Sequence, residues 1–215
     1  MVWNPWHGCH KYSAGCAHCY VYRRDGSVGR DASQVVKTAS FDLPVRKDRK
    51  GAWKIPPGET VYAVMTSDFF LEEADGWRPE IWEMMKARPD LQFVIITKRI
   101  LRFKECLPDD WGDGYENVEV GCTCENGEEA ARRLPVFVSL PIQKRFVITE
   151  PLLGPVLLEP WLQTGKISSV TAGGESGEGA RVCDYDWVLD IRDQCARCGV
   201  RFHFKQTGLH FRKDG

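Results

Sequence analysis

The sequence has no long hydrophobic run and no excess of charge of either sign. Its longest apolar runs, such as residues 93–96, are far too short to cross a membrane. Residues 1–5 lack the basic region followed by an apolar run that marks a secretory signal. The formal net charge is -1, so binding of nucleic acid would need a local basic patch. We therefore expect a cytoplasmic protein with no membrane partner.

The cysteines do not form the pattern of a disulfide framework. There are nine, an odd number, and several lie close together. Both features favour a reducing compartment and a metal site. The balance of 43% hydrophobic and 27% charged residues is that of an ordinary globular protein, and 215 residues allow one domain of good size.

Three of these cysteines, Cys9, Cys16 and Cys19, are spaced C-x6-C-x2-C, and Gly8 and Gly15 precede the first two. Glycine lets a loop fold back tightly, so that several thiols can point at one centre. Converging thiolates suit an iron–sulfur cluster or zinc. A [4Fe–4S] cluster held by three cysteines leaves one iron open to a small molecule. The zinc alternative would take its fourth ligand from His7, His10 or His18.

Short apolar segments alternate with helical patterns after residue 60, which predicts parallel β/α units. Strands are expected near residues 2–4, 61–65, 93–96, 118–121, 146–148, 169–171 and 202–204. Helices are expected near residues 20–24, 79–87, 100–106, 128–134 and 185–196. Six or seven strands in a chain of this length predict an α/β fold: one partial, open parallel β/α barrel of the TIM type over residues 1–215.

Polar residues follow nearly every predicted strand. They are Ser67–Asp68, Thr97–Lys98, Glu125–Asn126, Glu150, Glu175–Ser176 and Lys205–Gln206. In β/α barrels the carboxyl ends of the strands carry the active site. The pattern therefore predicts one shared site at that end, and the cysteine loop, which follows the first strand, at the same rim.

The region from about residue 26 to 60 reads as an irregular, basic insertion. Between residues 23 and 54 there are nine basic and four acidic residues. Such a run is usually a solvated face. The alternative is a patch that contacts phosphate groups, through which a nucleic-acid or protein substrate would bind.

Other residues keep two interpretations. Cys195 and Cys198 form a C-x2-C pair that is either two half-buried thiols or a second metal or redox site. Cys122 and Cys124 alternate along a strand and are expected on opposite faces. Lys205 either binds an anionic group or neutralises Glu150 or Glu175 in a buried pair. Two tryptophans near the cysteine loop, Trp3 and Trp6, are expected either in the core or as a shield for a cluster.

Several motifs together carry a resemblance to a known superfamily. They are residues 3–9, Ser13, Gly15–Cys16, Cys19–Tyr20, residues 97–99, Glu125–Asn126, residues 150–155, residues 173–177 with Ala180–Arg181, and residues 204–208. With them the chain resembles the radical S-adenosylmethionine (SAM) superfamily, and more specifically a phage and bacterial radical-SAM-like family of uncharacterised function. The superfamily's usual loop is C-x3-C-x2-C, whereas the first spacing here is six.

The resemblance implies that Cys9, Cys16 and Cys19 hold a [4Fe–4S] cluster whose fourth iron is chelated by SAM. An electron donor would reduce the cluster, and the resulting radical would abstract hydrogen from a substrate, for which nucleic acid is one candidate. Residues expected to bind the cofactor are Glu125, Asn126, Glu150, Gly173, Gly174, Glu175, Ser176 and Arg181. Residues expected to act in catalysis are Lys98, Glu150 and Lys205. The alternative is a non-catalytic, zinc-stabilised module that binds nucleic acid or protein.

Overall fold

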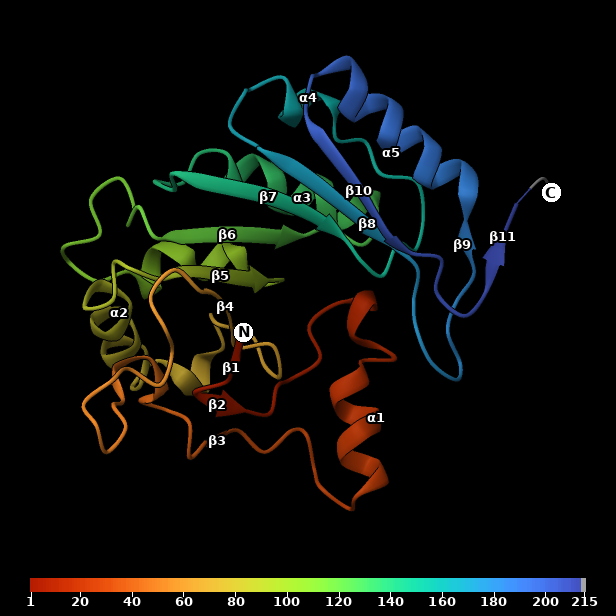
Figure 1. Ribbon diagram of the computed structural model, residues 1–215. Coiled ribbons are helices and arrows are strands. Elements are labelled where there is room, and N and C mark those ends of the chain that lie inside the picture. Colours follow the sequence, from red (N-terminus) through yellow and green to blue (C-terminus); the bar gives the residue numbers. More distant parts are fainter. Residues whose placement is uncertain (214–215) are drawn as a thin grey trace.

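The computed structural model describes residues 1–213 and is built around one seven-stranded parallel sheet. The strand order is β1-β4-β5-β6-β7-β8-β10, and every neighbouring pair is parallel. The strands are β1 (Val2–Trp3), β4 (Thr60–Ala63), β5 (Gln92–Thr97), β6 (Val118–Thr123), β7 (Lys144–Thr149), β8 (Ser169–Gly173) and β10 (Arg201–Gln206). The sheet curls into an open half-barrel (Figure 1), so the predicted partial barrel is confirmed.

The helices are α1 (Tyr20–Ser27), α2 (Arg78–Lys86), α3 (Gly127–Phe137), α4 (Glu159–Leu162) and α5 (Tyr185–Arg197). Four 3-10 turns accompany them: η1 (Ala14–Cys16), η2 (Leu43–Val45), η3 (Glu72–Ala74) and η4 (Ile100–Cys106). Helices α2, α3 and α5 lie on the convex side of the sheet (Figure 1). The predicted helices are confirmed, although residues 100–106 form a 3-10 helix. Helix α4 was not predicted, because four residues are too few to show a helical period.

The irregular region between residues 26 and 60 contains short paired segments. Strand β2 (Trp6–His7) pairs antiparallel with β3 (Val36–Lys37), and Lys47 bridges to Trp53. Near the other terminus β9 (Cys183–Asp184) pairs parallel with β11 (Phe211–Arg212). The sequence does not indicate these four strands, because two residues in each show no visible alternation.

The two faces of the sheet have different surroundings. Side chains on the convex face enter the main core, which contains Val61, Phe93, Ile95, Val120, Val147 and Val170. Trp3 and Trp6 belong to the same core, which confirms the first of the two expectations for them. On the concave face Val94, Phe146 and Ile148 form a separate small apolar cluster. Within residues 1–213 no helix combines the length and the apolar character that crossing a membrane requires.

A glycine shapes the concave face at its centre. Gly121 of β6 stands opposite Phe146 of β7 in the strand register. A Cβ atom at position 121 would lie 2.4 Å from Cζ of Phe146. The phenyl ring therefore lies across β6, in space that only a residue without a side chain leaves open.

We expect Gly121→Ala to destabilise the protein by roughly 1–3 kcal/mol, because the methyl group forces the ring or the strand to move. Adding Phe146→Leu to Gly121→Ala should recover part of the loss. Urea unfolding measures both effects. Gly76→Ala is the matched control, since a Cβ there meets nothing within 4 Å. A Gly121→Ala protein as stable as the control would show that the ring does not occupy this space.

Candidate functional site

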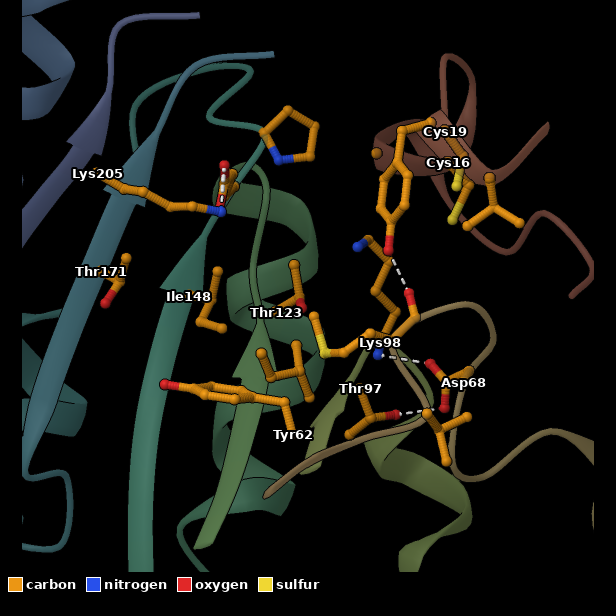
Figure 2. Close-up of a pocket in the computed structure, with 18 of the residues that line it drawn as sticks. Cys16, Cys19, Tyr62, Asp68, Thr97, Lys98, Thr123, Ile148, Thr171 and Lys205 are labelled. Atoms are coloured by element: carbon orange, nitrogen blue, oxygen red, sulfur yellow. Dashed lines mark hydrogen bonds and ion pairs between the residues drawn. The ribbon is translucent and has the colours of Figure 1, made fainter. Parts of the chain in front are cut away.

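One cavity of about 1100 Å³ lies along the concave face and reaches the cysteine loop. Its lining includes all three thiols of the C-x6-C-x2-C motif: Cys9, Cys16 and Cys19. Of the other predicted site residues, those that line it are Lys98, Glu150, Gly174, Glu175, Ser176 and Lys205. Figure 2 shows this arrangement, with Cys16 and Cys19 across the cavity from Lys205. These residues, predicted at one rim, therefore border a single cavity. Glu125, Asn126, Gly173 and Arg181 are not part of its lining.

The first cysteine is held by a tight turn that needs glycine. Gly8 has a φ of 96°, and a Cβ there would lie 2.2 Å from the carbonyl oxygen of Gln34. The backbone N–H of Gly8 donates to Thr66 O at 3.3 Å, and that of Cys9 donates to Ala32 O at 2.8 Å. Burial, and then the Asp68 carboxylate, raise the pKa of the Cys9 thiol to about 12. This thiol is therefore protonated at neutral pH.

The second and third cysteines lie where the loop enters α1. Cys16 ends η1, and its N–H donates to Ser13 O at 2.9 Å. Cys19 is the N-cap residue of α1, and its N–H donates to Cys16 O at 3.3 Å. Both thiols are free and half-buried, as is that of Cys9. Helical turns therefore fix the C-x2-C half of the motif.

Glu125 anchors the six-residue spacer between the first two cysteines. One of its carboxylate oxygens, Oε1, accepts hydrogen bonds from the Ser13 hydroxyl and from the N–H of Gly15, the latter at 3.1 Å. A Cβ at Gly15 would lie 2.9 Å from the same oxygen, so glycine allows this close approach. Glu125 follows β6, and the spacer is thereby attached to the end of a central strand.

The other oxygen of Glu125 is paired with a buried arginine. Arg133 Nη1 lies 2.7 Å from Oε2, and both side chains are 0% exposed. Arg133 Nη2 lies 2.8 Å from Glu129 as an ion pair without hydrogen-bond alignment. Burial raises the pKa of Glu125, but Arg133 and the Ser13 hydroxyl outweigh it, so the pKa lies below its ordinary value. Glu125 was predicted to bind the cofactor; both of its oxygens are occupied by protein donors.

Tyr12, also in the spacer, lies among three guanidinium groups. Its ring centroid is 4.6 Å from Arg99, 5.1 Å from Arg132 and 5.6 Å from Arg133. Arg99 also donates to His10 O at 3.0 Å. These cation–π contacts hold the outer part of the spacer on the rim. The sequence does not indicate this role, because the arginines lie far from Tyr12 along the chain.

Glu175 fastens the loop from the opposite side. Arg181 Nη2 lies 2.6 Å from its Oε1, while the Nε and backbone N of Arg181 each lie 2.9 Å from Oε2. Nδ1 of His18 lies 3.2 Å from Oε2. Arg181 also donates to Ala14 O at 3.0 Å. Burial raises the pKa of Glu175, but Arg181 outweighs it and holds the pKa at about 2. The carboxylate is thus ionised at neutral pH.

The glycine motif after β8 makes room for its neighbours. A Cβ at Gly173 would lie 3.2 Å from the carboxyl carbon of Glu150, and one at Gly174 would lie 2.0 Å from Thr207 O. The N–H of Gly174 donates to Gln206 O at 2.9 Å. The predicted motifs at 173–177 and 204–208 therefore pack backbone to backbone.

Glu150 is one of the carboxylates that line the cavity. Lys205 Nζ lies 2.8 Å from its Oε2, and Gln206 Nε2 lies 2.7 Å from its Oε1. The pairing of Lys205 with Glu150 agrees with one of the two predictions for it. The pair is not buried, however, since the Lys205 side chain is 55% exposed, and Glu175 pairs with Arg181 instead.

Asp68 joins the ends of β4 and β5. It accepts hydrogen bonds from the Thr97 hydroxyl at 2.7 Å and from the N–H of Lys98 at 2.9 Å (Figure 2). The sequence predicted Ser67–Asp68 at the rim but gave Asp68 no role in binding or catalysis. Nearby, Val64 has a φ of 62°, a costly conformation for a β-branched residue. Strain of this kind is frequent at functional sites.

Asn126, predicted to bind the cofactor, caps a helix. Its side chain accepts a hydrogen bond from the N–H of Glu129 at 2.9 Å, at the N-terminus of α3. Lys98, by contrast, lines the cavity, and within residues 1–213 its ammonium group makes no hydrogen bond or ion pair.

The prediction for Cys122 and Cys124 was wrong. Their sulfur atoms lie 3.9 Å apart, and both are buried. Residues two apart on a strand point to the same face, so these thiols could not be separated by the sheet. Cys195 is buried, Cys198 is half-buried, and both are free thiols.

A ready-made zinc site is not found among the described residues. Within residues 1–213 no group of three His, Cys, Asp or Glu side chains is arranged to hold one metal ion. The histidines considered as fourth ligands face carboxylates: His7 meets Asp25, His10 meets Glu73 and His18 meets Glu175. A [4Fe–4S] cluster has a different requirement, because each cysteine binds its own iron atom.

Much of the charge in the basic segment 23–54 is engaged within the protein. Lys37 pairs with Glu80 at 3.1 Å, and Arg46 pairs with Asp42. The ammonium group of Lys47 lies 4.4 Å from the ring centroid of Trp53. These contacts reduce the free positive charge that a phosphate-binding patch would need, and its role in binding a substrate stays a prediction.

Comparison with known proteins identifies a family. The model of one protein family, described as "Protein of unknown function (DUF5131)", matches residues 1–214. No curated protein and no solved structure matches the chain. These findings assign no activity, so the function must be inferred from the site.

We expect Glu125→Gln to lower the free energy of unfolding by up to roughly 3–5 kcal/mol, because the change removes one of the two carboxylates that compensate the buried Arg133. Chemical denaturation of both proteins measures the difference. Glu128→Gln, an exposed position in the first turn of α3, is the control and should be nearly neutral. A loss no larger than that of the control would contradict the anchoring role.

Glu175 should make stability depend on pH. Its pKa is depressed from 4.5 to about 2, so its contribution is complete above pH 4.5 and is lost as the pH falls toward about 2. That contribution is of the order of 3 kcal/mol. Glu175→Gln should therefore differ most from wild type near neutral pH and least in acid, when unfolding is followed at several pH values. Glu178→Gln, exposed in the same loop, is the control. A constant difference at every pH would be the contrary result.

Proposed function

The chain belongs to the DUF5131 family, and from this premise and its site we propose that it is a radical SAM-type enzyme. Cys9, Cys16 and Cys19 would hold a [4Fe–4S] cluster, and the adjoining cavity would receive SAM. One observation carries the proposal: the three half-buried thiols line the same hollow as the strand-end residues Glu150 and Glu175. In β/α barrels this end of the sheet is where catalytic groups converge.

The donor set fits the cluster. Three thiolates are soft ligands that suit iron–sulfur centres, and the strands bring no fourth cysteine to the cavity lining. A bound [4Fe–4S] cluster together with SAM supplies one-electron radical chemistry at a C–H bond of a substrate. The electron would come from a separate donor.

The side chains around the cavity would bind and orient the cofactor. Glu150 offers carboxylate oxygens to amino or hydroxyl groups, and Lys205, half-exposed beside it, can move aside when a ligand arrives. Lys98 has no partner within residues 1–213 and offers an ammonium group to a carboxylate. Glu125 and Glu175 act further back, because they hold the cysteine loop in position against the rim.

A non-catalytic, zinc-stabilised module is the weaker candidate. It would need ligands gathered around one ion, and the described residues contain no such group. It would also need free positive charge in segment 23–54, where several side chains already have partners.

We expect protein purified and reconstituted without oxygen to contain about four irons and four sulfides per chain. After reduction it should cleave SAM to methionine and 5′-deoxyadenosine. Cys16→Ala should lose the iron and the cleavage. Cys198→Ala, which removes another half-buried thiol, should keep both. Iron analysis and chromatography of the products measure the outcome.

Two results would contradict the proposal. One is a colourless protein with a single zinc per chain after the same treatment. The other is a full cluster in Cys16→Ala, which would place the ligands elsewhere.

A further inference from the structure

We propose that the concave face of the sheet, below the cysteine rim, binds a nucleotide unit. Its base would lie on the apolar floor around Phe146 and Ile148, and its phosphate would lie at the exposed edge strand β10. As a substrate site this inference rests on the proposed function; as a binding site it stands on the geometry alone.

The strand register places six side chains in two parallel rows. The first row is Phe146, Ser169 and Arg201, and the second is Ile148, Thr171 and His203. Each row runs from β7 across β8 to β10. In both rows an apolar side chain is followed by a side chain with a hydroxyl group and then by an arginine or a histidine. All six line the cavity, and Figure 2 shows Ile148 and Thr171 facing it.

The apolar end of the rows forms part of the floor of the cavity. Val94, Phe146 and Ile148 pack together on the concave face, with exposed fractions of 5%, 9% and 7%. The ring of Phe146 lies across Gly121 rather than standing up from the sheet. Tyr62 borders the floor and is 41% exposed. A parallel sheet normally has both faces covered, so this floor is suited to a planar apolar group.

The polar end of the rows is suited to an anion. Arg201 and His203 are exposed, and within residues 1–213 their side chains make no hydrogen bond or ion pair. The hydroxyls of Ser169 and Thr171 beside them likewise donate to no other described group. By contrast, Arg181 and Lys205 at the rim are paired with carboxylates. The planar fork of arginine matches phosphate oxygens, and hydroxyls add further donors.

Each row offers a place for a planar ring at one end and for an anion at the other. A nucleotide is a ligand that combines these two groups. The cavity of about 1100 Å³ exceeds what one drug-sized ligand fills, so a second ligand can lie beside SAM. Arg201 precedes Lys205 by four residues on β10, which corresponds to roughly 13 Å along a strand. SAM carries no phosphate and would not use this group. The nucleotide could be free or part of a single-stranded nucleic acid.

The test measures binding by titration calorimetry in the presence of saturating S-adenosylhomocysteine, which occupies the cofactor's place. The probes are 5′-AMP and 5′-GMP, the nucleosides adenosine and guanosine, and a short single-stranded RNA. We expect at least one nucleotide to bind about tenfold more tightly than its nucleoside. Arg201→Ala should abolish this difference, whereas Tyr62→Ala should weaken nucleotide and nucleoside alike. Arg192→Ala, on the exposed side of α5, is the matched control and should change neither.

The outcomes separate the site from the proposed reaction. Equal binding of nucleotide and nucleoside, an unchanged preference in Arg201→Ala, or complete exclusion by S-adenosylhomocysteine would overturn the site. Nucleotide binding by a protein that never cleaves SAM would support the nucleotide site and contradict the proposed reaction. Cleavage of SAM without nucleotide binding would support the reaction and contradict the nucleotide site. RNA that binds more tightly than the free nucleotides would identify a polynucleotide as the source; equal or weaker binding would identify a free nucleotide.

Discussion

The buried pair of Glu125 and Arg133 is the interaction on which the site depends. Both side chains are fully buried, and the carboxylate also accepts hydrogen bonds from Ser13 and Gly15 in the cysteine loop. Removing two charges from water is costly, and their attraction rarely gives a net gain in stability. The pair instead fixes the position of the loop, because Arg133 holds one oxygen of Glu125 while Ser13 and Gly15 of the loop donate to the other. The loop therefore has one position on the end of β6.

This anchor also explains how the unusual spacing of the cysteines is compatible with one common site. The six residues between Cys9 and Cys16 do not extend away from the protein. Ser13 and Gly15 bind Glu125, Tyr12 lies among three arginines, and Arg181 binds Ala14 O. The added length is taken up by contacts with the rim. The thiols at both ends of the spacer consequently line one cavity.

The fold was largely predictable, whereas the roles of individual site residues were not. Apolar strands of four to six residues show a clear pattern, and the polar residues after them must meet at one edge of a parallel sheet. The sequence placed Glu125 at that edge. It could not show that Ser13, 112 positions away, would occupy the carboxylate. Tyr12 and Asp68 gain their roles only from neighbours brought together by folding. The error for Cys122 and Cys124 was one of geometry, since the sequence already fixed their common face.

The strands separate stability from chemistry through their alternation. Phe93, Ile95 and Val120 point into the core beneath the helices, while Val94, Ile96 and Phe146 face the cavity. Because side chains alternate along a strand, the two sets share a backbone but not an environment. The side chains in the core determine where the rim and its cysteine loop lie. The side chains that face the cavity can vary with the ligand, provided that Gly121 leaves room for the Phe146 ring. Under the proposed function, the rim would hold the reactive group, while the concave face would determine which molecule is presented to it.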